Sequence, residues 1–363
     1  MGAAFRRVRR AALTAAQILI TIGIVWWVFR DPAKRAEMAA TLLRADAWWL
    51  LLGFAMYGVV ELISATRWQI LLRVQGFHLS FRRVLSLTLI GVFFNFFIPG
   101  GTGGDAVKMF YLVQETPGRR GTAILSVVVD RLIGLFALVV FAGTLIAMKW
   151  TWLRSAPELE RWIYLAVATL GGCVLFLATT FLISGLGLVH NLPTRMPGRD
   201  KIAELAMAYN VYGKAWLPSA AAFLLSFGAH VGYFGVFYCA IRALGSSGMQ
   251  IPKLAEFFAV MPIIGTITSL PISIGGVGVR EHLFQEFMGS LFAATQGVSV
   301  AISSAGYFLT LAWGLVGGLV YLCYRPSEHA RMRDIRAGIR QFEHEVAEER
   351  LAQESLAKQM PRK

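Results

Sequence analysis

The chain has 363 residues, of which 56% are hydrophobic and only 15% are charged, and its mean hydropathy is +0.59. A soluble domain carries roughly 25% charged residues, so this composition excludes an ordinary soluble enzyme and indicates an all-α polytopic membrane protein. The formal net charge of +14 does not call for a nucleic-acid partner, because most of the 35 Lys and Arg lie in short links and tails, where loops facing anionic lipid carry them.

The chain opens with a basic stretch, residues 1–10, followed by an uncharged run at 11–29. A secretory signal sequence shows the same order, but this run is longer and ends in Trp26-Trp27, so we predict an uncleaved first helix with a cytoplasmic N-terminus. Seven further apolar segments bring the total to about eight membrane segments. They lie at about 47–66, 84–98, 122–148, 162–184, 216–241, 254–270 and 298–323.

The segments at 84–98 and 254–270 fall short of the ~20 residues that cross the hydrocarbon core, and each runs into a break rich in Gly and Pro. Broken backbone at membrane depth leaves N–H and C=O groups without partners, so such breaks survive only inside protein or beside a wet cavity. We therefore predict that residues 84–114 and 254–292 form broken re-entrant hairpins.

The sequence is compatible with two topologies: six spanning helices with two re-entrant hairpins, or eight full spans. With the hairpins, six helices span, both termini are cytoplasmic, and fourteen Lys and Arg lie on the cytoplasmic side against nine outside. Eight full spans would place thirteen inside against eleven outside, so the positive-inside rule slightly favours the hairpins. The hairpins would then have opposite orientations, as in the inverted repeats of many transporters.

No cofactor or metal site is expected. Cys173, Cys239 and Cys323 lie in apolar runs without CxxC spacing or a nearby His, so neither a zinc site nor a disulfide framework is indicated. A P-loop requires Ser or Thr after its Lys, whereas Met109 follows Lys108 here.

Ionisable residues inside the apolar sequence are the candidate substrate-binding residues, because charge at membrane depth is costly and commonly functional. Asp105 follows the first break, either as a helix N-cap or as part of a site in which helix N–H groups and Lys108 face an anionic headgroup. Because a carboxylate there would compete with an anion, a cationic headgroup or a coupling proton is the alternative. Asp130 and Arg131 point ~100° apart on a helix, so we expect Lys108 to pair with Asp130 and Asp105 to pair with Arg131.

Arg280 and Glu281 follow the second break and could mirror the first pair, or Glu281 could cap the helix while Arg280 reaches outward. Glu61 and Arg67 are weaker candidates, and Arg67 is expected to reach the cytoplasmic interface. The remaining candidates lie at the breaks, where the glycines let a ligand approach the backbone closely. They are Asn95, Pro99, Gly100, Gly101, Gly103, Gly104, Pro271, Gly275, Gly276 and Gly278.

These motifs resemble the lysylphosphatidylglycerol synthase transmembrane region, also described as the flippase-like or UPF0104 family. The resemblance covers about residues 10–325 and is carried by the stretch from Asn95 to Asp105, by Asp130-Arg131, and by the stretch from Pro271 to Glu281. It implies three parts: a basic cytoplasmic N-terminus (1–10), a flippase-like transmembrane domain (11–324) and a charged cytoplasmic tail (325–363). The aminoacyl transferase domain of the bifunctional members is absent from this sequence.

The resemblance implies a lipid transporter of a bacterial-type inner membrane, not an enzyme. It would move a polar-headed lipid between leaflets: a phospholipid, an aminoacylated phospholipid or a polyprenyl-linked lipid. One alternative is a membrane-embedded headgroup or glycosyl transferase that uses the buried carboxylates as general bases. Another is a scaffold for a separately encoded lipid-modifying enzyme. The expected partners are membrane lipids, and neither the lipid nor the oligomeric state follows from the sequence.

Overall fold

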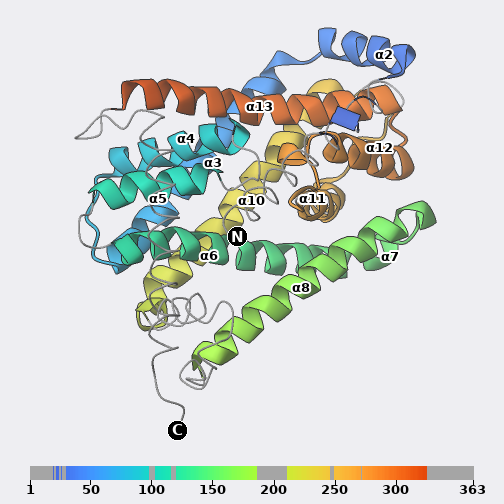
Figure 1. Cartoon of the computed structure of the whole chain (residues 1–363). Helices are drawn as coiled ribbons and strands as arrows, with labels where there is room; N and C mark the ends of the chain where they lie inside the picture. Colours follow the sequence, from blue (N-terminus) through green and yellow to red (C-terminus); the bar gives the residue numbers. More distant parts are fainter. Residues whose placement is uncertain are drawn as a thin grey trace, which may run out of the picture.

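The computed structural model describes residues 30–97, 103–115, 120–185, 211–245, 249–270 and 272–324, together with 19, 22, 23 and 26. Helices make up nearly all of this part of the chain, which confirms the predicted all-α fold (Figure 1). Within the described ranges, five helices are long and apolar enough to cross a membrane, so the protein is a polytopic membrane protein. Most of the predicted first helix, the N-terminal residues 1–10 and the tail at 325–363 lie outside the described residues.

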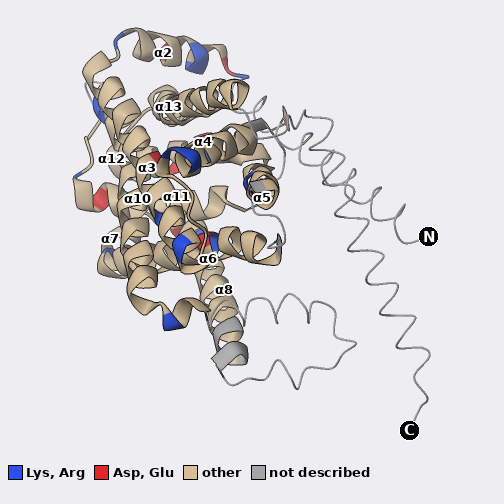
Figure 2. Ribbon diagram, turned by 90° about the vertical axis from the view of Figure 1, so that its left-hand side faces the viewer, with Lys and Arg blue, Asp and Glu red and all other residues tan. Residues whose placement is uncertain are grey.

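The long helices run at different tilts past one another, and most of the ribbon carries no charge (Figures 1 and 2). They are α3 (Ala47–Val74), α6 (Arg120–Met148), α8 (Glu160–Gly185), α10 (Trp216–Leu244) and α13 (Gln296–Cys323). The short helix α2 (Pro32–Leu43) precedes α3, and α7 (Trp150–Leu153) and the 3-10 turn η1 (Pro157–Leu159) join α6 to α8.

Two pairs of shorter helices form the predicted hairpins. The first pair is α4 (Phe81–Phe97) and α5 (Gly103–Glu115), and the second is α11 (Leu254–Thr268) and α12 (Val279–Phe292), with the 3-10 turn η3 (Ile274–Gly276) in its break. Each pair contains a helix of 15 or more residues followed by one of 13 or 14, so neither partner is long enough for an untilted span.

Helix α3 is longer than predicted. The sequence suggested an end near residue 66, because Arg67 and Arg73 look like the start of a link, but the helix continues to Val74. It can continue because the guanidinium of Arg67 has an ion-pair partner inside the protein and need not reach water.

In the first hairpin, α4 and α5 come together through a glycine contact and a side-chain hydrogen bond. A Cβ atom on Gly104 would overlap the carbonyl group of Gly91, so only glycine allows this approach. The backbone N–H of Gly104 donates to Oδ1 of Asn95 at 2.9 Å, which satisfies one of the free donors at the start of α5.

In the second hairpin, glycines supply backbone conformations that other residues rarely adopt. Gly275, Gly276 and Gly278 have φ values of 61°, 72° and 85°. The N–H of Gly278 donates to Oε2 of Glu281 at 2.6 Å, so this side chain caps the start of α12 as predicted.

Both hairpins pack against α13 (Figure 1), and Phe96 of the first and Arg280 of the second both contact Tyr307 of that helix. At the base of the first hairpin, Arg83 lies over the ring of Tyr324, just after the end of α13. The second hairpin runs the opposite way, because α12 ends next to the start of α13 while Arg280, near its other end, contacts Ser303. The two hairpins therefore enter from opposite ends of a membrane-length helix, which is the predicted opposed arrangement.

Candidate functional site

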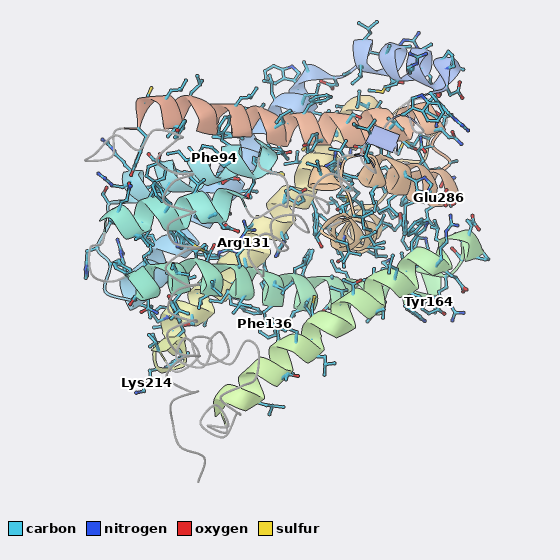
Figure 3. The ribbon with its side chains drawn as sticks, in the orientation of Figure 1. Phe94, Arg131, Phe136, Tyr164, Lys214 and Glu286 are labelled. Carbon is cyan, nitrogen blue, oxygen red and sulfur yellow. The ribbon has the colours of Figure 1, made fainter. Side chains whose placement is uncertain are left out.

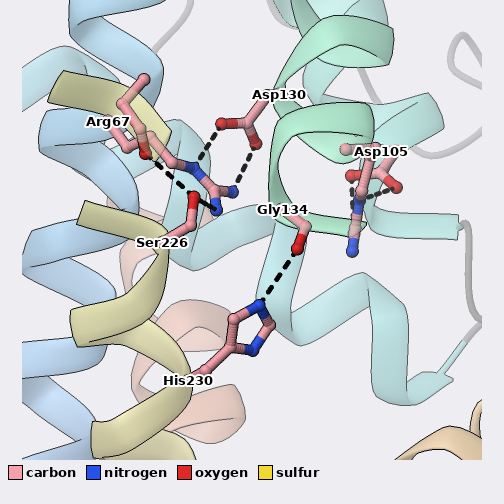
Figure 4. A network of polar contacts seen from close by, with 8 residues as sticks. Arg67, Asp105, Asp130, Gly134, Ser226 and His230 are labelled. Carbon is pink, nitrogen blue, oxygen red and sulfur yellow. Dashed lines mark hydrogen bonds and ion pairs between the residues drawn. The ribbon is translucent and has the colours of Figure 1, made fainter. Parts of the chain in front are cut away.

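An ion pair joins α3 to α6 in the interior. The guanidinium of Arg67 donates from Nε to Oδ1 of Asp130 at 2.8 Å and from Nη2 to Oδ2 at 3.0 Å (Figure 4). Its third nitrogen donates to Oγ of Ser226 on α10 at 3.0 Å. The side chains of Arg67 and Asp130 are only 12% and 6% exposed. The prediction that Arg67 reaches the cytoplasmic interface is therefore wrong. Lys108 was the wrong prediction for the partner of Asp130, because the planar fork of Arg67 satisfies both carboxylate oxygens.

The predicted pairing of Asp105 with Arg131 is confirmed. Nε of Arg131 lies 2.7 Å from Oδ2 of Asp105, and Nη2 donates to Oδ1 at 2.8 Å (Figure 4). This bond ties the start of α5, just after the first break, to α6. The carboxylate side chain is 9% exposed, so it is held almost entirely inside the protein.

Arg131 combines a deep position with an exposed side chain. It is the twelfth residue of the 29-residue α6, or ~16 Å along the helix, and lies near the middle of the molecule in Figure 3. Even so, 55% of its side chain is exposed. An exposed guanidinium at that depth is costly against lipid tails, so its natural neighbours are water and polar headgroups.

Lys108 and Glu61 are buried without a salt bridge to any other described residue. Lys108 places Nζ 4.1 Å from the centre of the Trp68 ring and is 8% exposed. Glu61 is 5% exposed and lies beside Tyr57, one turn earlier on α3. Both residues thus belong to the interior of the site, although Glu61 was one of the weaker candidates predicted from the sequence.

Six ionisable residues on α3, α5 and α6 form what we call the central charge cluster. Three are cationic and three are carboxylic acids, so the formal charge of the cluster is zero when all are ionised. Buried ion pairs of this kind contribute little net stability, which makes a functional reason for them more plausible. The members are Glu61, Arg67, Asp105, Lys108, Asp130 and Arg131.

His230 of α10 lies beside this cluster. Its Nε2 is 3.1 Å from the carbonyl oxygen of Gly134 on α6, a contact in which the ring nitrogen donates (Figure 4). It therefore links α10 to α6, one turn beyond the Arg67–Asp130 pair.

A second charged group lies after the second break. Nη2 of Arg280 donates to Oε1 of Glu281 at 2.8 Å, and Oγ of Ser303 donates to the same oxygen at 3.0 Å. Arg280 and Glu281 are 5% and 3% exposed, so the alternative in which Arg280 reaches outward is wrong. Burial is possible because Glu281 and Ser303 accept hydrogen bonds from two of its nitrogens, Nε and Nη2.

The two hairpins match each other only in part. Asp105 and Glu281 are each the third residue of the second helix of their hairpin. The basic partner differs, because Asp105 is bound by Arg131 of the following helix, whereas Glu281 is bound by the residue before it. The predicted mirror relation therefore holds for the carboxylates and fails for Lys108 and Arg280.

Tyr307 is a site residue that the sequence analysis missed. Cζ of Arg280 lies 4.2 Å from the centre of its ring, and the ring of Phe96, at the end of α4, lies 5.5 Å away. One side chain of α13 therefore contacts the tips of both hairpins. The only signal in the sequence is an aromatic residue that follows a run of small residues, Ser303-Ser304-Ala305-Gly306.

Among the predicted glycines and polar residues of the breaks, the structure places Asn95, Gly103, Gly104, Gly275, Gly276 and Gly278 at the hairpin tips. The candidates Pro99, Gly100, Gly101 and Pro271 lie outside the described residues.

Comparison with known proteins gives a consistent result. The family model described as "Lysylphosphatidylglycerol synthase TM region" matches residues 14–314. A UPF0104 membrane protein of Methanothermobacter thermautotrophicus is 22% identical over 347 residues, which cover 87% of this chain and 96% of that protein. A UPF0104 membrane protein of Pyrococcus horikoshii is 32% identical over 132 residues, so the match spans only 38% of that relative and 34% of this chain.

Proposed function

Because this chain belongs to the lysylphosphatidylglycerol synthase TM region family, we propose that it moves a polar-headed lipid between the two leaflets of a bacterial-type inner membrane. The observation that carries the proposal is the meeting of two opposed half-span hairpins at Tyr307, in a protein that also exposes Arg131 deep along a spanning helix. Opposed broken helices that meet near the midplane are a common way to build a transport site.

The chemical problem of lipid transfer explains the charges. A polar headgroup must cross the hydrocarbon region, where it loses the solvation of bulk water, while the acyl chains can stay in lipid. Arg131 offers a partly exposed guanidinium at the required depth, held in place by Asp105. We propose that the headgroup contacts this exposed part of the central charge cluster as it passes.

The geometry favours transport over a transferase reaction. A general base needs a carboxylate that can accept a proton, but both oxygens of Asp130 and both oxygens of Asp105 are held by arginines. Glu61, the remaining carboxylic acid of the cluster, is only 5% exposed, so a substrate reaches it less readily than the exposed side chain of Arg131. We therefore propose that the protein is a transporter and not an enzyme. We also propose that both termini are cytoplasmic, because this places more of the basic residues on that side.

The test is leaflet exchange of fluorescent phosphatidylglycerol in proteoliposomes, measured by reduction of the probe from outside. Wild-type protein should give exchange above that of protein-free liposomes, and Asp105→Asn and Arg131→Ala should abolish it. Arg154→Ala is the matched control, because it also breaks an Arg–carboxylate pair, with Glu160, but one that is exposed. Unchanged exchange in folded Asp105→Asn protein would contradict the transport role and favour the scaffold alternative.

A further inference from the structure

Two hydrogen-bond donors lie next to each other in the interior without an acceptor. Nζ of Lys108 rests over the ring of Trp68 at 4.1 Å, and it has no hydrogen bond or salt bridge with another described residue. Trp68 is fully buried, and its indole Nε1–H is also without an acceptor among the described residues. Buried tryptophan N–H groups usually find a partner, so this pair is unusual.

The neighbouring cations do not share this property. Arg67 is bound on two nitrogens by Asp130, and Arg131 is bound on two nitrogens by Asp105. Lys108 is thus the one cation of the central charge cluster that no carboxylate contacts directly within the described part of the chain. The attraction of an ammonium for an aromatic face is weaker than an ion pair, so the site gains most from a further acceptor.

The position of Lys108 suits a negatively charged ligand. It lies on α5, five residues after the helix begins at Gly103, and free N–H groups and the positive end of the helix dipole face the break there. Arg131 lies within electrostatic range of Lys108 and keeps a guanidinium nitrogen, Nη1, without a partner among the described residues. Lys108, Trp68 and Arg131 therefore each have one N–H group, at Nζ, Nε1 and Nη1, that no described residue accepts.

We propose that Lys108, supported by Trp68, binds the phosphate of a lipid headgroup, so that the transported lipid is an anionic phospholipid. This inference rests on the proposed function, because it takes the ligand to be a lipid. A neutral sugar or glycerol headgroup would leave the ammonium of Lys108 without a counter-charge, and an amine headgroup would add a donor where acceptors are lacking. A phosphate supplies the negative charge and several acceptor oxygens together.

The experiment is lipid titration of the purified full-length protein in detergent, followed by native mass spectrometry. Three probes separate the contribution of the phosphate from that of the acyl chains. They are dioleoyl-phosphatidylglycerol, dioleoylglycerol without the phosphate, and soluble glycerophosphoglycerol without the acyl chains. The wild-type protein should prefer phosphatidylglycerol over dioleoylglycerol by about tenfold or more, the usual scale for a charge-assisted hydrogen bond. The soluble headgroup should bind far more weakly, because it lacks the acyl chains.

The variants test the assignment to Lys108. Lys108→Met keeps an unbranched stem over Trp68 and should abolish the preference, whereas Lys108→Arg should retain most of it. Trp68→Phe keeps a ring but removes the N–H, so it should weaken phosphatidylglycerol binding about threefold. Arg242→Met is the matched control, because Arg242 also stacks on a tryptophan of α3, with its Cζ 4.6 Å from the Trp49 ring, outside the cluster. It should leave the preference intact.

Three results would overturn the proposal. The first is a phosphatidylglycerol preference that survives in folded Lys108→Met protein, and the second is binding of dioleoylglycerol to the wild type as tight as that of phosphatidylglycerol. The third is equally tight binding of the soluble headgroup, which would indicate a site for free anions. Leaflet exchange separates this inference from the proposed function. If leaflet exchange requires Asp105 but the preference for phosphatidylglycerol is unchanged in Lys108→Met, the proposed phosphate site is wrong and the proposed transport function is supported. If the preference depends on Lys108 but no exchange occurs, the phosphate site stands and transport is wrong.

Discussion

The guanidinium carbon of Arg280 lies 4.2 Å from the ring centre of Tyr307, so a charged residue of the second hairpin rests on an aromatic face of α13. The other neighbour of that ring is Phe96, at the tip of the first hairpin. Segments almost 200 residues apart in the sequence are therefore joined through one tyrosine, and Arg280 and Phe96 do not need to touch each other.

Removing the ring of Tyr307 should uncouple the two hairpin tips. Tyr307→Ala should lower the rate of leaflet exchange about tenfold and reduce stability by about 3 kcal/mol, because it leaves a cavity and removes the cation–π contact. Tyr307→Phe keeps the ring and should stay within about twofold of the wild type. Tyr164→Ala, at a half-exposed tyrosine of α8, is the control and should have little effect. Equal loss in the Ala and Phe variants would show that the hydroxyl, not the ring, matters.

Replacing one member of the Arg67–Asp130 pair should destabilise the protein more than replacing both members. Asp130→Asn leaves a buried, unpaired guanidinium and should cost about 3 kcal/mol or more, whereas the double variant Arg67→Met, Asp130→Leu should recover much of that loss. Thermal unfolding in detergent measures both. If the double variant were as unstable as the sum of the two single variants, the pair would not act as a unit.

Neutralising Glu61 should strengthen the binding of an anionic lipid. Glu61 is the carboxylic acid of the central charge cluster without a salt bridge in the described part of the chain, and it lies within electrostatic range of Lys108. Glu61→Gln changes the formal charge of the cluster from zero to plus one, so phosphatidylglycerol should bind about three- to tenfold more tightly. Weaker binding would instead indicate that Glu61 contacts a cationic headgroup. Titration by native mass spectrometry distinguishes the two signs.

Adding one methyl group at Gly104 should prevent the first hairpin from closing. In Gly104→Ala the new Cβ would overlap the carbonyl of Gly91, so α4 and α5 must separate, at a cost of about 2 kcal/mol or more. Gly143→Ala, on α6, is the matched control. A Cβ atom added at Gly143 would have no atom of a packing neighbour within 4 Å. This substitution should leave the unfolding temperature unchanged or slightly raised. An equal effect of both substitutions would exclude the close contact as the cause.

Cysteine accessibility in whole cells should separate opposed hairpins from eight full spans. In a variant without the native cysteines, Ser80→Cys lies at the base of the first hairpin and Lys253→Cys at the base of the second. Opposed hairpins require the first position to be labelled only from the cytoplasm and the second only from outside. Labelling of both from the cytoplasm would support eight full spans.

Some of this architecture could be read from the sequence, and the reasons are local. A Pro-Gly-rich stretch inside an apolar run must break a helix, so both hairpins were predictable, and so was the capping role of Glu281 three residues after Gly278. The pairing of Asp105 with Arg131 was predicted from the need of a charge at membrane depth for an opposite charge, although the same reasoning gave Asp130 the wrong partner.

The partners that sequence reasoning missed depend on packing between distant helices. Arg67 and Asp130 are 63 residues apart, and their pairing requires that α3 continue beyond the point where its polar residues suggest a link. The sequence around Trp68 and Tyr307 does not reveal their contacts, because an aromatic residue in an apolar helix usually serves only to fill space. Their roles appear only when α5 and α12 are placed against them.

Helix α13 meets the two hairpins with the same side of its surface. Its contacts with the second hairpin come from Ser303 and Tyr307, and its contacts with the first come from Tyr307, Gly314 and Gly317. At ~100° per residue these four positions fall within about a quarter of the helix circumference. A rotation of α13 about its own axis would therefore loosen or tighten both tips in one movement. Through this shared face, one helix is in contact with the tips of both hairpins.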